Sequence, residues 1–145
     1  MTRRRARVVR PIAFVLPLAL LLSACGDDEP AGPEALEGQT WVLTQFVAED
    51  GSTEIVDVGV DAEFDGESVA GTSGCNRYNA SYEASGNELS FGPIAGTQMA
   101  CPEPQMSVEA RYLQLLESVA TFEVEGRAMS MADGEGTPVL QFSQG

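Results

Sequence analysis

Three cysteines, Cys25, Cys75 and Cys101, are the residues of this sequence best suited to covalent or metal chemistry. The chain contains no histidine, and its eight basic residues are all arginines. A catalytic cysteine needs a neighbouring base such as histidine, and a zinc site needs further thiolate or imidazole ligands. We therefore expect neither a metal nor a cofactor, and the role of each cysteine depends on the compartment in which the chain folds.

The first 24 residues have the layout of an export signal. Five arginines lie between residues 3 and 10, and a run of 12 apolar residues, 11–22, follows. Such a run is short for a bilayer span, which takes about 20 residues, so a retained transmembrane anchor is the weaker alternative. The run ends in Leu22-Ser23-Ala24-Cys25, which resembles a bacterial lipobox. This resemblance implies cleavage before Cys25 and lipid on its sulfur, which would anchor the protein to the membrane.

The segment 25–35 reads as a lipidated N-terminus followed by an acidic tether. Residues 26–35 include Asp, Glu, Gly and Pro but no bulky apolar side chain, so we expect disorder there. Residues 36–145 suit one domain with a modest core.

The chain after the predicted cleavage point contains three arginines and all 22 acidic residues, a net charge of 3 − 22 = −19. This charge disfavours nucleic acid and anionic lipid headgroups as partners. A solvated acidic surface is the simplest interpretation, with a calcium site or a cationic partner as alternatives.

Cys75 and Cys101 are the even remainder once Cys25 is assigned to the lipid. Disulfides persist outside the cytoplasm, so the pair predicts one bridge. Free structural thiols and thiol chemistry are the alternatives.

Alternation of apolar and polar residues predicts short antiparallel strands along most of the domain. Tyr78, Ala80 and Tyr82, for example, alternate with polar residues. Between 104 and 119, Val108, Tyr112, Leu115 and Val119 follow helical spacing, and Leu116 widens that stripe. We expect an α+β fold, in which an antiparallel, barrel-like or strongly curved sheet packs on one amphipathic helix. The expected strands cover 40–47, 62–65, 68–71, 78–83, 89–91, 122–124, 129–131 and 140–142.

Six short motifs occur along the predicted domain: Trp41-x-Leu43, Gly71-x-x-Gly74-Cys75-Asn76-x-Tyr78, Leu89-x-Phe91, Thr97-x-Met99-Ala100-Cys101, Glu109-x-x-Tyr112-x-x-x-Leu116 and Leu140-x-Phe142. Together they resemble the META domain, the family of HslJ-like bacterial lipoproteins. The resemblance covers nearly all of 36–145 and implies an antiparallel β-fold wrapped on one helix, often in the cell envelope. It also implies a loose link to stress response and secretion, with no agreed enzymatic mechanism.

The candidate site residues come from two of these motifs. Turn glycines and Asn residues are most often architectural, which favours a structural corner over a ligand site. We expect a monomeric, non-enzymatic lipoprotein on the outer face of the bacterial cell membrane that binds or stabilises another envelope component. A carrier of a small apolar ligand or lipid is the alternative, and no motif selects a catalytic carboxylate pair. The candidate residues are Gly71, Gly74, Asn76, Arg77, Tyr78, Thr97 and Met99.

Overall fold

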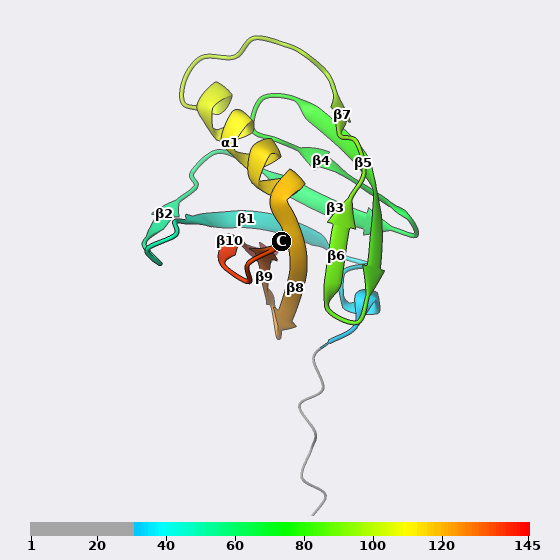
Figure 1. Ribbon diagram of the computed structural model, residues 1–145. Helices are drawn as coiled ribbons and strands as arrows, with labels where there is room; N and C mark the ends of the chain where they lie inside the picture. Colours follow the sequence, from blue (N-terminus) through cyan, green and yellow to red (C-terminus); the bar gives the residue numbers. More distant parts are fainter. Residues whose placement is uncertain (1–30) are drawn as a thin grey trace, which may run out of the picture.

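Antiparallel strands make up most of the computed structural model, which describes residues 31–145 (Figure 1). One α-helix interrupts the strands before the last three of them. The elements are η1 (Pro33–Ala35), β1 (Thr40–Val47), β2 (Thr53–Ile55), β3 (Asp61–Asp65), β4 (Ser68–Thr72), β5 (Arg77–Ser85), β6 (Glu88–Phe91), β7 (Ala95–Gly96), α1 (Gln105–Ser118), β8 (Val119–Glu125), β9 (Ala128–Asp133) and β10 (Pro138–Gln144).

Eight strands close into a barrel, which confirms the expected fold class. Their order is β1, β3, β4, β5, β6, β8, β9 and β10, and β10 pairs back onto β1. The closing register sets Leu43 opposite Phe142 and Phe46 opposite Leu140. β2 continues the sheet beside β1, and β7 pairs with β5. The join between β6 and β8 is short, with Glu88 and Thr121 as its one residue pair.

Three hairpins of the barrel share one turn chemistry. Gly66, Gly86 and Gly126 each follow a strand and adopt φ values of 62°, 59° and 59°. The residue after each glycine keeps a negative φ, since no non-glycine residue of the described chain has a positive one. This is the pattern of a two-residue II′ turn, whose twist matches that of the flanking strands. Glycine at the first turn position therefore sets the register of three strand pairs.

The barrel interior is filled by side chains from every wall. Along β5 the burial alternates strictly, so Tyr78, Ala80 and Tyr82 point inward. Trp41 is fully buried, and its indole N–H donates to Leu36 O at 2.9 Å. The core thus begins just outside the barrel, at the residue that follows η1. Its largest members are Trp41, Tyr112, Phe46, Phe142, Leu36, Leu43, Leu89, Leu116, Met129, Met131, Leu140 and Val60.

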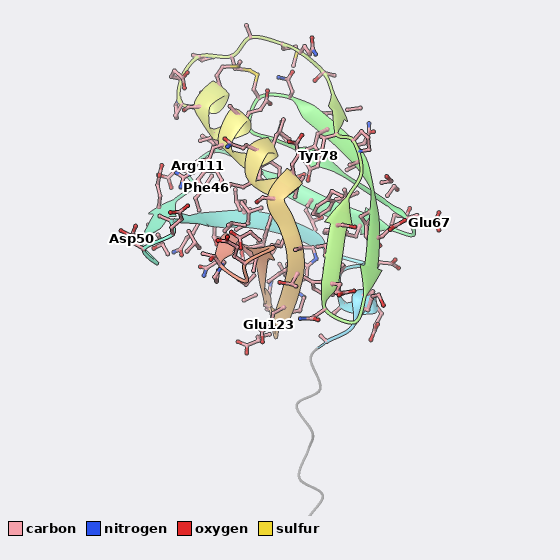
Figure 2. All side chains as sticks on the ribbon, viewed as in Figure 1. Phe46, Asp50, Glu67, Tyr78, Arg111 and Glu123 are labelled. Atoms are coloured by element: carbon pink, nitrogen blue, oxygen red, sulfur yellow. A yellow bond between two sulfur atoms is a disulfide. The ribbon has the colours of Figure 1, made fainter. Side chains whose placement is uncertain are left out.

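The helix α1 lies over one end of the barrel, and η1 lies at the other end (Figure 1). Tyr112 and Leu116 are its buried residues, one turn apart, so the predicted phase is confirmed with Leu116 at its centre. Arg111 connects the helix to β1 and β2. Its guanidinium lies 4.4 Å from the Phe46 ring centroid on β1 and forms a salt bridge with Glu54 on β2 (Figure 2). No helix within residues 31–145 has the length and apolar character needed to cross a bilayer.

Three short segments differ from the sequence prediction. Residues 33–35, expected in the tether, form the turn of helix η1, because Pro33 suits a first turn and Leu36 after it is fully buried. β2 and β7 were not predicted: their side chains are all exposed, so neither shows an alternating pattern. The predicted signal peptide, Cys25 and the tether up to residue 30 lie outside the described residues.

Candidate functional site

Cys75 and Cys101 form a disulfide at the helix end of the barrel, with Cα atoms 5.9 Å apart. Cys75 lies between β4 and β5, and Cys101 lies between β7 and α1. The bridge therefore ties the loop before the helix to a barrel corner, as the even cysteine count predicted. We call the residues 71–78, 97–101 and Glu109 the bridged corner.

Asn76 organises the bridged corner from a buried position, with 3% of its surface exposed. Its Oδ1 accepts hydrogen bonds from the Met99 N–H at 2.7 Å and the Thr97 hydroxyl at 2.9 Å. Its Nδ2 donates to Met99 O at 3.2 Å and to Glu109 Oε1 at 2.8 Å. A buried amide destabilises the protein unless its polar atoms have hydrogen-bond partners. Both polar atoms of the Asn76 amide have such partners. Asn76 thus takes the place of a strand partner at Met99, while the Thr97 N–H donates to Arg77 O at 3.0 Å.

The Glu109 carboxylate holds the corner from the helix side. It accepts hydrogen bonds from the Asn76 N–H at 2.7 Å and the Ser73 hydroxyl at 2.5 Å, besides the Asn76 amide. Burial by itself would raise the pKa of this carboxyl, but the hydrogen bonds from Ser73 and Asn76 outweigh it, and the pKa lies below its ordinary value. Glu109 is therefore an ionised structural acceptor rather than a general acid.

Gly71 and Gly74 are required by close packing in the same corner. A Cβ on Gly71 would lie 2.0 Å from Asp61 O, which no side chain tolerates. Gly74 has a φ of 113°, and a Cβ there would lie 3.3 Å from Gln105 O at the start of α1. These glycines let β3 and the helix approach the corner.

Tyr78 joins the corner to the core. Its hydroxyl donates to Asp61 O at 3.0 Å and lies 2.7 Å from the Tyr112 hydroxyl, so Tyr112 is the donor between the two phenols. Burial raises the pKa of both phenols, because the phenolate would lose its hydration. Both remain neutral at ordinary pH and act as hydrogen-bonding core residues.

Arg77, Thr97 and Met99 lie on the surface of the corner. The Arg77 N–H donates to the Thr97 hydroxyl at 3.2 Å, while the Arg77 side chain is exposed. Met99 is 61% exposed, although its backbone is held on both sides by Asn76. The structure therefore brings all seven predicted residues together but leaves Met99 as the large apolar side chain that faces outward.

The bridged corner holds its polar groups in contacts with one another. Its carboxylate, its amide and its serine satisfy one another, and its two sulfurs are bonded together. Within residues 31–145, no group of three His, Cys, Asp or Glu side chains is placed to hold a metal ion.

The profile of the META domain matches residues 34–145 of this chain.

The chain belongs to the META domain family.

Solved structures share the META domain fold over most of the chain. An NMR structure of a protein from Burkholderia xenovorans is 26% identical, with a TM-score of 0.69, and the match covers 99% of this chain and 97% of that one. A second NMR structure is 20% identical, with a TM-score of 0.58 and coverage of 78% and 94%. A crystal structure of a DUF4847 family protein from Bacteroides vulgatus is 13% identical, with a TM-score of 0.56 and coverage of 76% and 94%. No curated protein matches this chain.

Three side chains that hold the bridged corner in place were missed by sequence reasoning. Glu109 was noted only as a motif residue, and Ser73 and Asp61 were given no role. One signal was available for Glu109: it lies three residues before Tyr112, so the two share a helix face that was expected to pack on the sheet. The Ser73 hydroxyl also lies 2.8 Å from the nearby Asn76 O, but its contact with Glu109 spans 36 positions and that of Asp61 with Thr72 spans 11, so no local signal predicts either.

Proposed function

We propose that this META domain protein is a non-enzymatic lipoprotein of the bacterial cell envelope, whose domain binds another envelope component. The proposal rests first on the N-terminal sequence, where an export signal ends at the lipobox cysteine Cys25. An acidic segment then separates Cys25 from Leu36, the first fully buried residue of the described chain. Such an arrangement keeps a folded domain close to a membrane surface, where its partners would also lie.

The observation that carries the binding role is the exposure of Met99 on a fixed backbone. An exposed large apolar side chain is common on protein surfaces, but this one is held by two hydrogen bonds and lies two residues from a disulfide. Because the backbone of Met99 is already fixed, a partner's pocket would have to order only the side chain, which lowers the entropy cost of binding. The buried network of the bridged corner is thus explained as the support of a contact residue.

The alternative of a small-ligand carrier draws no support from the barrel interior. Trp41, Tyr112 and Phe142 occupy it, together with the other core residues. The two hollows beside β8 and beside β3 are open to solvent, and each has acidic side chains among its lining residues. We therefore keep the protein-binding role as the proposal.

Site-specific cross-linking in intact cells tests the proposal. A photoreactive p-benzoylphenylalanine at Met99 should give a discrete cross-linked product with an envelope component. The same residue at Glu83, which is exposed on the barrel wall away from the corner, is the matched control. Equal products from both positions, or none from position 99, would count against the bridged corner as a contact surface.

A further inference from the structure

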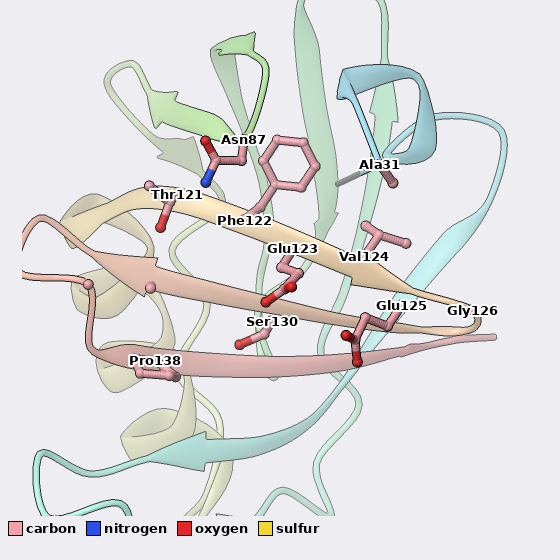
Figure 3. A pocket seen from close by; sticks show the side chains of 12 residues that line it. Ala31, Asn87, Thr121, Phe122, Glu123, Val124, Glu125, Gly126, Ser130 and Pro138 are labelled. Carbon is pink, nitrogen blue, oxygen red and sulfur yellow. The ribbon is translucent and has the colours of Figure 1, made fainter. Parts of the chain in front are cut away.

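A groove on the described surface runs along β8 and reaches the η1 end of the barrel. Its volume is about 940 Å³, and its walls come from β8, β9 and β10 and from Ala31 (Figure 3). On one side of β8 the side chains of Glu123 and Glu125 line the groove, and on the other side Val124 points towards Ala31 (Figure 3). The groove therefore follows both the outer face of β8 and its edge.

The edge of β8 is left open over its second half. The β5–β6 hairpin reaches only as far as Phe122, whose N–H donates to Asn87 O at 2.8 Å. Beyond that point no strand formed by residues 31–145 pairs with this edge of β8. The bond from Phe122 points away from β9, and backbone groups alternate in direction along a strand. The N–H and C=O of Val124 therefore also point away from β9, into the groove.

An open strand edge is a template for another extended chain, because its backbone groups remain to be paired. Proteins that bind peptides by strand addition take their affinity from the backbone and their selectivity from neighbouring side chains. Here the neighbouring exposed side chains are carboxylates.

Charge decides between the possible occupants. Residues 31–145 contain three arginines and 22 − 3 = 19 acidic residues, since Asp27, Asp28 and Glu29 precede them. A second copy of this domain would bring a net charge of 3 − 19 = −16 to the groove. The preceding segment of the chain itself is acidic at 27–29 and would be repelled by Glu123 and Glu125. Arg127, in the β8–β9 turn, donates to Gln144 O and is the cation closest in sequence to the groove.

We propose that the groove binds an extended, basic segment of a partner protein, which adds as a strand to the β8 edge at Val124. The lysines or arginines of that segment contact Glu123 and Glu125, while its backbone pairs with Val124. This inference goes beyond the proposed function: it concerns the opposite end of the barrel from Met99 and does not depend on the lipid at Cys25.

The test uses the full chain and a ten-residue peptide of alternating lysine and threonine. Binding should slow the exchange of the Val124 amide hydrogen in NMR spectra, whereas a glutamate–threonine peptide of equal length should leave it unchanged. Reversing both groove charges with Glu123→Lys and Glu125→Lys should weaken binding by about tenfold, from two exposed charge contacts. The matched control, Glu67→Lys with Glu83→Lys, changes two exposed carboxylates elsewhere on the barrel and should weaken it by less than about twofold.

A second variant tests the backbone contact alone. Val124→Pro removes the edge N–H while leaving the β8–β9 pairing intact, because proline is tolerated where the N–H faces away from the sheet. It should reduce peptide binding by about tenfold relative to Val124→Ala. Three results would overturn the proposal: an unchanged Val124 amide at saturating peptide, equal losses in the two charge-reversal pairs, or protection of Val124 by self-association of the chain.

Discussion

The side chain of Asn76 forms hydrogen bonds with the peptide groups on both sides of Met99. The amide oxygen accepts the Met99 N–H at 2.7 Å, and the amide nitrogen donates to Met99 O at 3.2 Å. A backbone neighbour in a sheet would make the same two contacts, so one side chain substitutes for a strand. Asn76, which lies between β4 and β5, therefore holds the loop before α1 together with the Cys75–Cys101 bridge.

Replacing Asn76 by Asp tests this dependence. The variant keeps the acceptor for Met99 N–H but loses the donor and places a second carboxylate beside Glu109. We expect a loss of about 1–3 kcal/mol in the free energy of unfolding, as for a buried polar group left without its partner. Asn79→Asp, at an exposed position three residues along, should change it by less than about 0.5 kcal/mol. Denaturant titration measures both, and equal effects would contradict the role of Asn76.

Low pH should destabilise the folded protein by protonating the Glu109 carboxylate of the bridged corner. Its pKa in the folded state lies below the ordinary value of 4.5, because hydrogen bonds from Ser73 and Asn76 outweigh the effect of burial. A lowered folded-state pKa contributes stability above the unfolded-state pKa, and this contribution is lost as the pH falls through the folded-state pKa. Glu109→Gln should therefore lower the urea midpoint at about pH 7, and its deficit relative to the parent should shrink near pH 3. Glu117→Gln, exposed on the same helix, is the control. A deficit independent of pH would show that the charge of Glu109 is not involved.

The packing of α1 predicts a strong contrast between two neighbouring helix positions. Leu116 is 1% exposed, whereas Gln114 is exposed. Leu116→Ala should cost about 2–5 kcal/mol from lost burial and the remaining cavity. Gln114→Ala should cost less than about 0.5 kcal/mol. The comparison of urea midpoints is decisive, since similar values would require a different rotation of the helix.

The disulfide should protect the bridged corner from unfolding and from thiol reagents. In freshly isolated protein Cys75 and Cys101 should react with a maleimide only after reduction. Because 26 residues separate the two cysteines, the bridge should stabilise the domain by about 3.5 kcal/mol through the entropy of the unfolded chain. A Cys75→Ser and Cys101→Ser double variant measures that loss in denaturant titration. Titratable thiols before reduction would refute the bridge in the isolated protein.

Membrane attachment is predicted to depend on Cys25. Cys25→Ser removes the thiol that would carry the lipid and should move the protein out of the membrane fraction. Cys75→Ser, which leaves the lipobox untouched, should keep the protein membrane-bound. A Cys25→Ser protein that stays uncleaved and membrane-bound would instead identify 11–22 as a transmembrane anchor.

Local signals in the sequence were enough to predict most strands and the phase of the helix. Tyr78, Ala80 and Tyr82 reveal a strand because one of its faces is buried, and Gly126 marks a hairpin because its turn requires a positive φ. β2 escaped prediction because it pairs with β1 through backbone groups while its side chains remain in solvent.

Long-range contacts explain the remaining failures. The closure of the barrel and the role of Ser73 depend on partners far away in the chain, which no window of neighbouring residues reveals. For the same reason the two motifs predicted which residues meet, through their cysteines, but not that Glu109 would unite them. The role of Glu109 follows only from its contacts with Ser73 and Asn76 in the folded chain.

The pairing of β1 with β10 has a consequence for the biosynthesis of the protein. Thr44 donates to Gln141 O across a separation of 97 residues, so the two strands of the closing seam leave the ribosome at widely different times. Until β10 has emerged, β1 has no neighbour on that side, and the sheet remains open. The barrel of a nascent chain therefore stays incomplete until the last strand, β10, has been synthesised. The topology itself sets the end of synthesis as the earliest moment at which the seam can close.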